Sequence, residues 1–199
     1  MEKYQNKYRI ASARAQWWDY GWNGAYFVTI CTANRDHFFG KIENGTMILS
    51  RVGVIADILW YEIPYHASFV ELGDFVVMPN HIHGILILDK PVAVIETRHA
   101  VETRHALSLS TPKSPPQPTL PANTPGKSRF QNQGKNTISS IDGGYKSAVT
   151  NNANRLGYIN GWQSRFHDHI IRDDEEYQRI SDYIVNNPKN WKVDKFYNP

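Results

Sequence analysis

The chain of 199 residues contains a single cysteine, Cys31, so no internal disulfide and no cysteine-ligated zinc site can form. This usage fits a reducing compartment, and we expect a cytoplasmic protein. No stretch approaches the roughly 20 consecutive apolar residues that cross a membrane. The N-terminal residues MEKYQNKYRIASARAQWWDY also lack the apolar region of a secretory signal. The formal net charge is only +3, which allows a nucleic-acid partner but does not by itself indicate one.

The hydrophobic fraction is 41% and the aromatic fraction 13%, which is enough for a core and excludes wholesale disorder. The composition changes sharply over 90–136. This segment holds seven of the eleven prolines and repeats Glu-Thr-Arg-His-Ala at 96–100 and 102–106. Such a composition builds no packed core, so we predict a flexible Pro-rich insertion there. Residues 1–89 and 137–199 are then the N-terminal and C-terminal parts of one domain.

Alternating and β-branched residues predict strands over 26–32, 69–78 and 81–88, with a hairpin over 38–49 that turns at Asn44-Gly45. Ser50 begins a helix whose apolar face includes Val52, Ile55, Leu59 and Ile63, and Pro64 is expected to end it. Thr137 starts a second helix with Ile138, Ile141, Tyr145, Val149 and Leu156 on one face. An extended segment over 162–172 and a helix from Asp173 to Pro188 follow. This order predicts an α+β fold, a ferredoxin-like or RRM-like antiparallel sheet with helices mainly on one face.

The segment Met78-Pro-Asn-His-Ile-His-Gly-Ile-Leu-Ile-Leu88 carries the most chemical information. Side chains two apart on a strand leave the same face, so His81 and His83 point together while Ile82 turns into the core. Two adjacent imidazoles are costly to bury unless a partner such as a divalent metal holds them. Hydrogen-bonded surface histidines are the alternative. A second pair, His167 and His169, looks more like an edge or loop, where His169 could contact phosphate.

Tyr183 and Asn187 lie four residues apart on the last predicted helix and therefore share a face. A phenol beside an amide oxygen can place a nucleophile and a hard-oxygen ligand together. Two imidazoles with one amide oxygen suit Mg²⁺ or Mn²⁺ better than a closed zinc site. Taken alone, the pattern also fits an ordinary helix end before Pro188.

Three segments in this order resemble a known family: VVMPNHIHGILIL, YKSAVTNNANRL and WQSRFHDHIIRDDEEYQRISDYIVNNP. They resemble the single-tyrosine transposases with a His-hydrophobic-His (HUH) motif, in the REP-associated tyrosine transposase branch. The resemblance also includes the early strand YFVTICT and covers most of the chain outside 90–136. That insertion is the departure from the family pattern.

The resemblance implies that the HUH motif lies on a central strand, with His81, His83 and Asn187 as ligands of Mg²⁺ or Mn²⁺. It implies Tyr183 as the nucleophile that cleaves single-stranded DNA at a hairpin, through a 5′-phosphotyrosine link that a second 3′-OH can resolve. DNA transposition or recombination would be the outcome, by a monomer or a homodimer.

Tyr145 is the rival nucleophile, although Val149 at the i+4 position cannot bind metal and either core packing or a DNA contact suits Tyr145 better. Four residues are candidate DNA contacts: Lys146, Arg165, His169 and Arg172. Near the N-terminus, the basic and aromatic candidates are Lys3, Lys7, Arg9, Arg14, Trp17, Trp18 and Trp22, with packing on the sheet as the alternative for the tryptophans. Two other functions stay open: a non-catalytic nucleic-acid-binding module, and a metallohydrolase that uses water.

Overall fold

A computed structural model describes residues 3–4, 7–8, 18–91 and 135–197. Nearly all of the predicted insertion over 90–136 lies outside these residues, as do Arg9, Arg14 and Trp17. The domain boundaries and the flexibility of that segment therefore stay predictions. The described part of the chain contains all of the residues predicted for the metal and tyrosine site.

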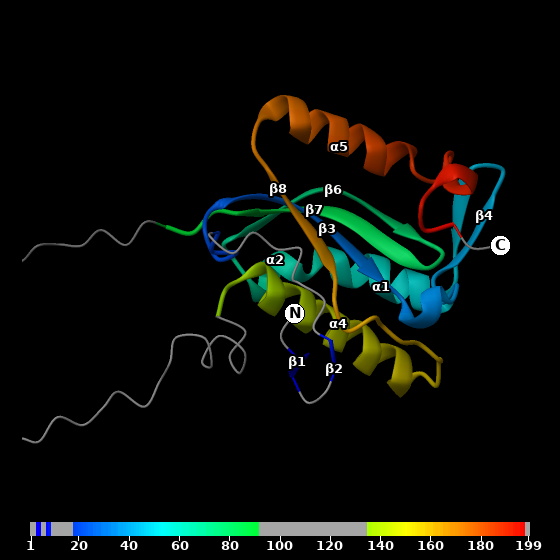
Figure 1. Cartoon of the computed structure of the whole chain (residues 1–199). Helices are drawn as coiled ribbons and strands as arrows, with labels where there is room; N and C mark the ends of the chain where they lie inside the picture. Colours follow the sequence, from blue (N-terminus) through cyan, green and yellow to red (C-terminus); the bar gives the residue numbers. More distant parts are fainter. Residues whose placement is uncertain (1–2, 5–6, 9–17, 92–134, 198–199) are drawn as a thin grey trace, which may run out of the picture. The chain divides into compact units, whose positions relative to one another are not determined.

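Four antiparallel strands form the central sheet, in the order β6-β7-β3-β8 (Figure 1). Their bounds are β3 Gly24–Cys31, β6 Val70–Met78, β7 His81–Leu88 and β8 His167–Ile171. The Pro79-Asn80 turn joins β6 to β7, so these strands pair from Met78 opposite His81 onward. Strand β7 lies between β6 and β3, and the predicted position of the histidine motif on a central strand is confirmed.

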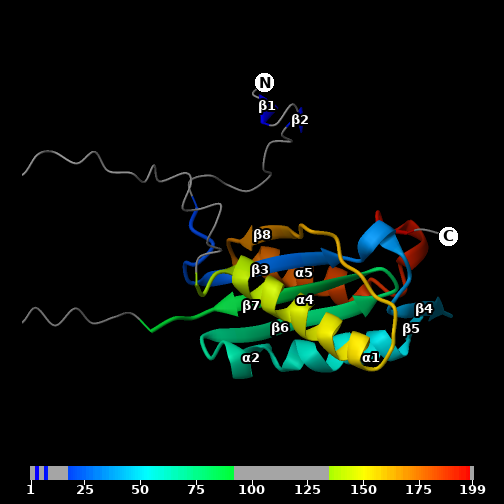
Figure 2. The ribbon, with the colours of Figure 1, turned by 90° about the horizontal axis from the view of Figure 1, so that it is seen from below.

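Helices α1 (Arg51–Tyr61), α2 (Ile63–His66) and α4 (Ile138–Arg155) lie on one face of this sheet, and α5 (Asp174–Asn186) crosses the other (Figures 1 and 2). The predicted α+β class with an antiparallel sheet is confirmed, with most helices on one face as expected. No helix of the described residues is long and apolar enough to cross a membrane.

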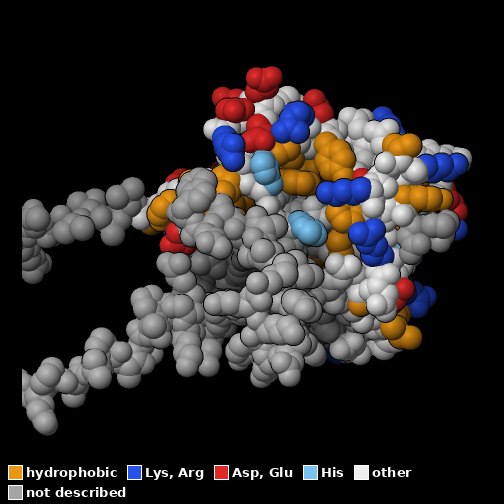
Figure 3. Space-filling view, in the orientation of Figure 1, with side chains coloured by type: hydrophobic (Ala, Val, Ile, Leu, Met, Phe, Trp, Pro, Cys, Tyr) orange, Lys and Arg blue, Asp and Glu red, His pale blue; other side chains and the backbone are white. Residues whose placement is uncertain are grey.

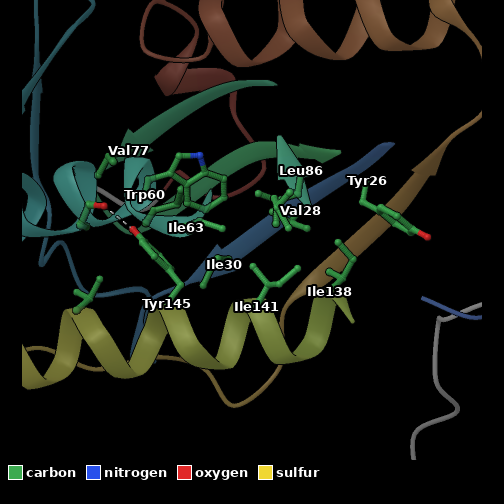
Figure 4. Close-up of a cluster of buried hydrophobic side chains, with 14 of the residues drawn as sticks. Tyr26, Val28, Ile30, Trp60, Ile63, Val77, Leu86, Ile138, Ile141 and Tyr145 are labelled. Atoms are coloured by element: carbon green, nitrogen blue, oxygen red, sulfur yellow. Dashed lines mark hydrogen bonds between the residues drawn. The ribbon is translucent and has the colours of Figure 1, made fainter. Parts of the chain in front are cut away.

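The main core fills the space between the sheet and the pair α1 and α4 (Figure 4). Trp60 of α1 is fully buried there, with its ring stacked on Phe75 and in edge contact with Tyr145. Trp60 lies directly over Gly84 of β7, because a Cβ at Gly84 would be 2.3 Å from the Trp60 ring. A glycine in the histidine strand thus lets α1 pack closely on the opposite face of the sheet.

Two helix predictions are wrong in detail. Pro64 does not end the first helix, because the chain turns at Glu62 and Pro64 falls in the first turn of α2, where a missing N–H costs little. Leu156 does not lie on the buried face of α4, since the helix ends at Arg155 and Leu156 is 55% exposed. Ala153 occupies the last buried position of that face instead.

The remaining elements are short: β1 (Lys3–Tyr4), β2 (Lys7–Tyr8), β4 (Gly40–Glu43), β5 (Thr46–Leu49), and the 3-10 turns η1 (Ala33–Arg35) and η2 (Trp191–Val193). The predicted hairpin over 38–49 is confirmed as β4 and β5. Its turn has positive φ at both Asn44 and Gly45, as the Asn-Gly pair predicts.

Candidate active site

His81 and His83 lie on the face of the sheet that α5 covers, and both side chains are completely buried. The pleat explains this placement: Ile82 and Leu86, on the other face of the same strand, belong to the main core. In the pairing with β3, His81 stands opposite Cys31 and His83 opposite Thr29. The ring centroids of the two histidines are 4.4 Å apart. The predicted common direction of the two imidazoles is therefore observed.

Asn80 holds the ring of His81 in one orientation. The Asn80 side-chain Nδ2 donates to the carbonyl oxygen of Phe196 at 3.0 Å, and Asn80 Oδ1 lies 2.8 Å from His81 Nδ1. A carbonyl oxygen only accepts, so the amide orientation is fixed and Oδ1 must accept the Nδ1–H of His81. The proton therefore sits on Nδ1 and the lone pair on Nε2. That Nε2 atom is buried and has no hydrogen-bond partner among the described residues.

His83 is held between a strand neighbour and the last helix. Its Nδ1 lies 2.9 Å from the hydroxyl of Thr29 on β3, and its Nε2 lies 3.1 Å from the phenolic oxygen of Tyr183. The Phe27 ring packs on His83 with 5.2 Å between centroids and also meets the edge of Tyr183. Tyr183 is thus positioned directly against one of the paired histidines.

Helix α5 supplies both Tyr183 and Asn187 to the site. Asp173 caps its first turn by accepting from Glu176 N at 2.8 Å, and three acidic residues in that turn favour the helix start. The buried Ile180 and Ile184 pack helix α5 on the sheet, and this packing directs the Tyr183 face of the helix toward β7. Asn187 caps the helix just before Pro188 and is fully buried, with an Oδ1 atom that has no partner among the described residues.

Asp194 is a site residue that the sequence reasoning missed. Its Oδ2 accepts from the Tyr183 hydroxyl and from Asn187 Nδ2, each at 2.8 Å, and its Oδ1 accepts from Phe196 N at 2.6 Å. Ligand atoms of His81, His83 and Asp194 all lie within 4.8 Å of one another. The aspartate in the aromatic tail WKVDKFYNP was the available signal, but only the fold of that tail brings it to the histidines.

Burial lowers the pKa of His81 to about 3 and that of His83 well below its ordinary value, so both imidazoles are neutral and can act as ligands. Burial, followed by the hydrogen bond and negative charge of Asp194, raises the pKa of Tyr183. Burial acts to raise the pKa of Asp194, but hydrogen bonds from Phe196 N–H, Asn187 and Tyr183 lower it overall. The site thus pairs neutral imidazoles with a carboxylate and a protonated phenol.

These donors fit a divalent cation. Two buried atoms with lone pairs, His81 Nε2 and Asn187 Oδ1, have no hydrogen-bond partner among the described residues, and such groups are costly to bury unless they are satisfied. With Asp194 beside them, the set combines nitrogen and hard oxygen donors. We therefore regard His81, His83 and Asp194 as a possible metal site, with Asn187 adjacent to it.

Tyr145, the rival nucleophile, lies on the opposite side of the sheet. Its hydroxyl donates to Ala56 O at 2.7 Å within the main core (Figure 4), and burial raises its pKa well above the ordinary value. Lys146 is also mostly buried, and its ammonium group pairs with Asp142 at 2.9 Å. Both geometries favour structural roles for these two residues.

The other predicted DNA contacts lie near β8. Arg165 and Arg172 are exposed, and His169 Nε2 lies 2.8 Å from Glu176 Oε1. Trp18 packs against the main core and donates to the Tyr26 hydroxyl at 3.0 Å, as the packing alternative predicted, whereas Trp22 is 52% exposed. Binding of DNA by these residues stays a prediction.

The fold of this chain, an antiparallel sheet crossed by helix α5, is similar to that of a solved REP-associated tyrosine transposase. The solved structure of the REP-associated tyrosine transposase bound to a REP hairpin has a TM-score of 0.52 to this chain at 18% identity, over 91% of this chain and 74% of that one. The predicted resemblance is confirmed for the fold. A putative transposase from Deinococcus radiodurans aligns with a TM-score of 0.40 at 12% identity, over 88% of this chain and 97% of that one.

The chain belongs to the family of an uncharacterised protein from Haemophilus influenzae. The two sequences are 34% identical over 187 residues, which make up 94% of this chain and 92% of the relative. No protein-family model matches the chain.

Proposed function

We propose that this protein is a metal-dependent enzyme that cuts and rejoins single-stranded DNA through Tyr183. The observation that carries the proposal is the position of the Tyr183 hydroxyl, 3.1 Å from His83 Nε2 and 2.8 Å from Asp194 Oδ2. A phenol at a possible metal site, half-exposed to an incoming strand, is the arrangement that nucleophilic attack on a phosphodiester requires. The shared fold of the REP-associated tyrosine transposase supports the same reading.

The proposed ligands are His81 and His83, with oxygen donors from Asn187 and Asp194, and the proposed ion is Mg²⁺ or Mn²⁺. When bound there, a divalent cation stabilises the negative charge that develops on the scissile phosphate and on the phenolate. The protein contributes the fixed geometry: Asn80 and Thr29 orient the two imidazoles, and the capped end of α5 holds Asn187 in place.

In the proposed reaction, the Tyr183 oxygen attacks the phosphorus while its proton passes to Asp194, which already accepts the phenolic hydrogen bond. The bond from phosphorus to the 3′-oxygen breaks, and that oxygen takes up a proton from water. The products are a 5′-phosphotyrosine link and a free 3′-OH. Because the link retains a phosphodiester, attack by another 3′-OH regenerates Tyr183 and joins two strands without ATP.

The proposed substrate is single-stranded DNA next to a hairpin, by analogy with the REP hairpin in the solved transposase structure. The exposed Arg165, His169 and Arg172 are the proposed contacts along β8, and Trp22 is a proposed stacking surface. The protein acts as a monomer or a homodimer in this proposal.

The test uses a pool of DNA hairpins with randomised single-stranded flanks, incubated with the full-length protein and Mn²⁺. A 3′-end label must appear on a protein adduct that survives denaturing electrophoresis, while a 5′-end label must leave as a free fragment ending in 3′-OH. Tyr183→Phe is expected to form no adduct, and the matched variant Tyr145→Phe is expected to form it. Sequencing of the adducts maps the cleaved position.

Each alternative has its own outcome in this experiment. Cleavage without an adduct indicates a metallohydrolase that uses water and contradicts the tyrosine mechanism. Binding without cleavage indicates a non-catalytic nucleic-acid-binding module. An adduct that persists in Tyr183→Phe but disappears in Tyr145→Phe shows that the nucleophile is misassigned. Absence of binding even at low salt refutes every nucleic-acid function.

A further inference from the structure

Two cationic side chains, Arg35 and Lys195, lie over the Phe196 ring beside the candidate active site. The aromatic ring of Phe196 is buried and packs on His81 and His83, with 4.7 Å and 5.6 Å between ring centroids. Arg35 Cζ lies 5.2 Å from the centre of the Phe196 ring, and Lys195 Nζ lies 4.8 Å from it. One aromatic ring therefore separates both positive charges from the paired histidines.

The backbone around Arg35 is unusual and firmly held. Asn34 and Arg35 both have positive φ angles, of 53° and 61°. Non-glycine residues in that region cost roughly 1–2 kcal/mol each and persist only where their surroundings fix them. Here the Thr32 N–H and hydroxyl both donate to Asn80 O at 2.9 Å, so the turn is anchored to the same asparagine that orients His81.

The Arg35 side chain is hydrogen-bonded to the backbone of Lys195, and no acidic side chain of the described residues pairs with either cation. Arg35 Nη1 donates to the backbone oxygen of Lys195 at 3.3 Å, which ties the η1 turn to the tail that carries Asp194. Both side chains are exposed, and within the described parts of the chain neither forms a salt bridge with a carboxylate. Two neighbouring exposed cations that form no salt bridge in the described residues are suited to bind an anion from outside.

The surface charge on this face is unevenly distributed. Asp and Glu side chains gather over the N-terminal part of α5, while Lys and Arg side chains lie among hydrophobic ones toward the C-terminus (Figure 3). Burial is the main cause of the low His81 pKa; the charge of Asp194 raises that pKa, and the smaller effects of Arg35 and Lys195 lower it. Lys195 directly follows Asp194, which accepts the hydrogen bond of the Tyr183 hydroxyl, so the chain brings this positive region next to the nucleophile.

We propose that Arg35 and Lys195 form a phosphate clamp that binds the phosphodiester next to the scissile one and so positions the strand for attack by Tyr183. This inference rests on the proposed function, because it assigns further substrate-positioning residues to the same site. The clamp binds the backbone and not the bases, so it contributes to affinity and register without reading sequence.

The test measures binding of the mapped hairpin substrate at several salt concentrations, with Tyr183→Phe as the parent protein so that no strand is cut. Arg35→Gln and Lys195→Gln each replace the charged side chain with a shorter, uncharged polar one. Each is expected to weaken binding and to reduce the slope of log K against log salt, and the double variant is expected to reduce that slope by about 0.7, the value for one phosphate contact on single-stranded DNA. Arg155→Gln, an exposed arginine at the end of α4 on the other side of the sheet, is the matched control and is expected to leave the slope unchanged.

A second substrate carries one uncharged methylphosphonate linkage next to the mapped cleavage position. The parent protein is expected to bind it more weakly than the normal strand. The difference between the two strands is expected to be smaller in Arg35→Gln, where only Lys195 is left, to disappear in the double variant Arg35→Gln and Lys195→Gln, and to return in Arg35→Lys. Equal losses in the parent and in Arg35→Gln, or an unchanged salt slope, would overturn the clamp while the tyrosine mechanism stands. Failure of the parent to bind any hairpin overturns the proposed function itself.

Discussion

Replacement of Asn80 tests how the residue that orients His81 controls metal binding. Asn80 is 1% exposed, and its side chain makes two hydrogen bonds, one with His81 Nδ1 and one with Phe196 O. In Asn80→Ala both buried partners lose their hydrogen bond, at about 1–3 kcal/mol each. We therefore expect the free energy of unfolding to fall by about 2–6 kcal/mol, a large part of the 5–15 kcal/mol of an ordinary domain.

The same change removes the group that keeps the proton on Nδ1 and the lone pair on Nε2 of His81. Loss of such an outer partner costs metal sites about 10–100-fold in affinity. Asn80→Asp is the discriminating variant, because an aspartate retains an acceptor for the His81 Nδ1–H whether or not it is protonated. We expect Asn80→Asp to bind Mn²⁺ far more tightly than Asn80→Ala.

The assay is calorimetric titration of the folded variants with Mn²⁺, alongside chemical unfolding of each, with His81→Ala as the control that removes a ligand. Circular dichroism confirms that each variant is folded at the titration temperature. If folded Asn80→Ala binds Mn²⁺ as tightly as the unaltered protein, the tautomer argument is refuted. Equal weakening in Asn80→Asp and Asn80→Ala would show that the bond to Phe196, and not the one to His81, matters for the metal.

Packing and charge lead to four further predictions. Gly144→Ala is expected to raise the free energy of unfolding by about 0.5–1 kcal/mol. Gly144 lies in the interior of helix α4, and a Cβ at this position would have no atom within 4 Å; thermal unfolding measures the change. Gly84→Ala is expected to lower it by about 1–3 kcal/mol through a clash with the Trp60 ring; equal stability would show that α1 shifts freely. Lys146→Met is expected to cost about 3 kcal/mol in urea unfolding, because it removes the ammonium partner of a nearly buried carboxylate, while hairpin affinity stays unchanged. Tyr145→Phe is expected to lose about 1 kcal/mol of stability and to keep its adduct, and loss of the adduct would contradict its assignment to the core.

Local pattern was sufficient for most of the secondary structure. The Asn-Gly turn, the Ser50 and Asp173 caps and the alternation in β7 each depend on a few neighbouring residues, and all are observed. The errors at Pro64 and Leu156 arose where the neighbouring residues are compatible with two different helix boundaries. A proline can follow a helix or begin the next one, and tertiary packing decided between them.

The sequence by itself determined that His81 and His83 share a face and that Tyr183 and Asn187 share another, because strand and helix periods are set by backbone geometry. Only the tertiary structure decided that these two faces meet, when the apolar side of α5 packed on the sheet. It alone brought in Asp194, Asn80 and Arg35, whose roles depend on hydrogen bonds and ring contacts between segments far apart in the chain. The pattern of residues along the sequence shows which side chains share a face of one helix or strand. An active site depends on the distances between side chains of different elements.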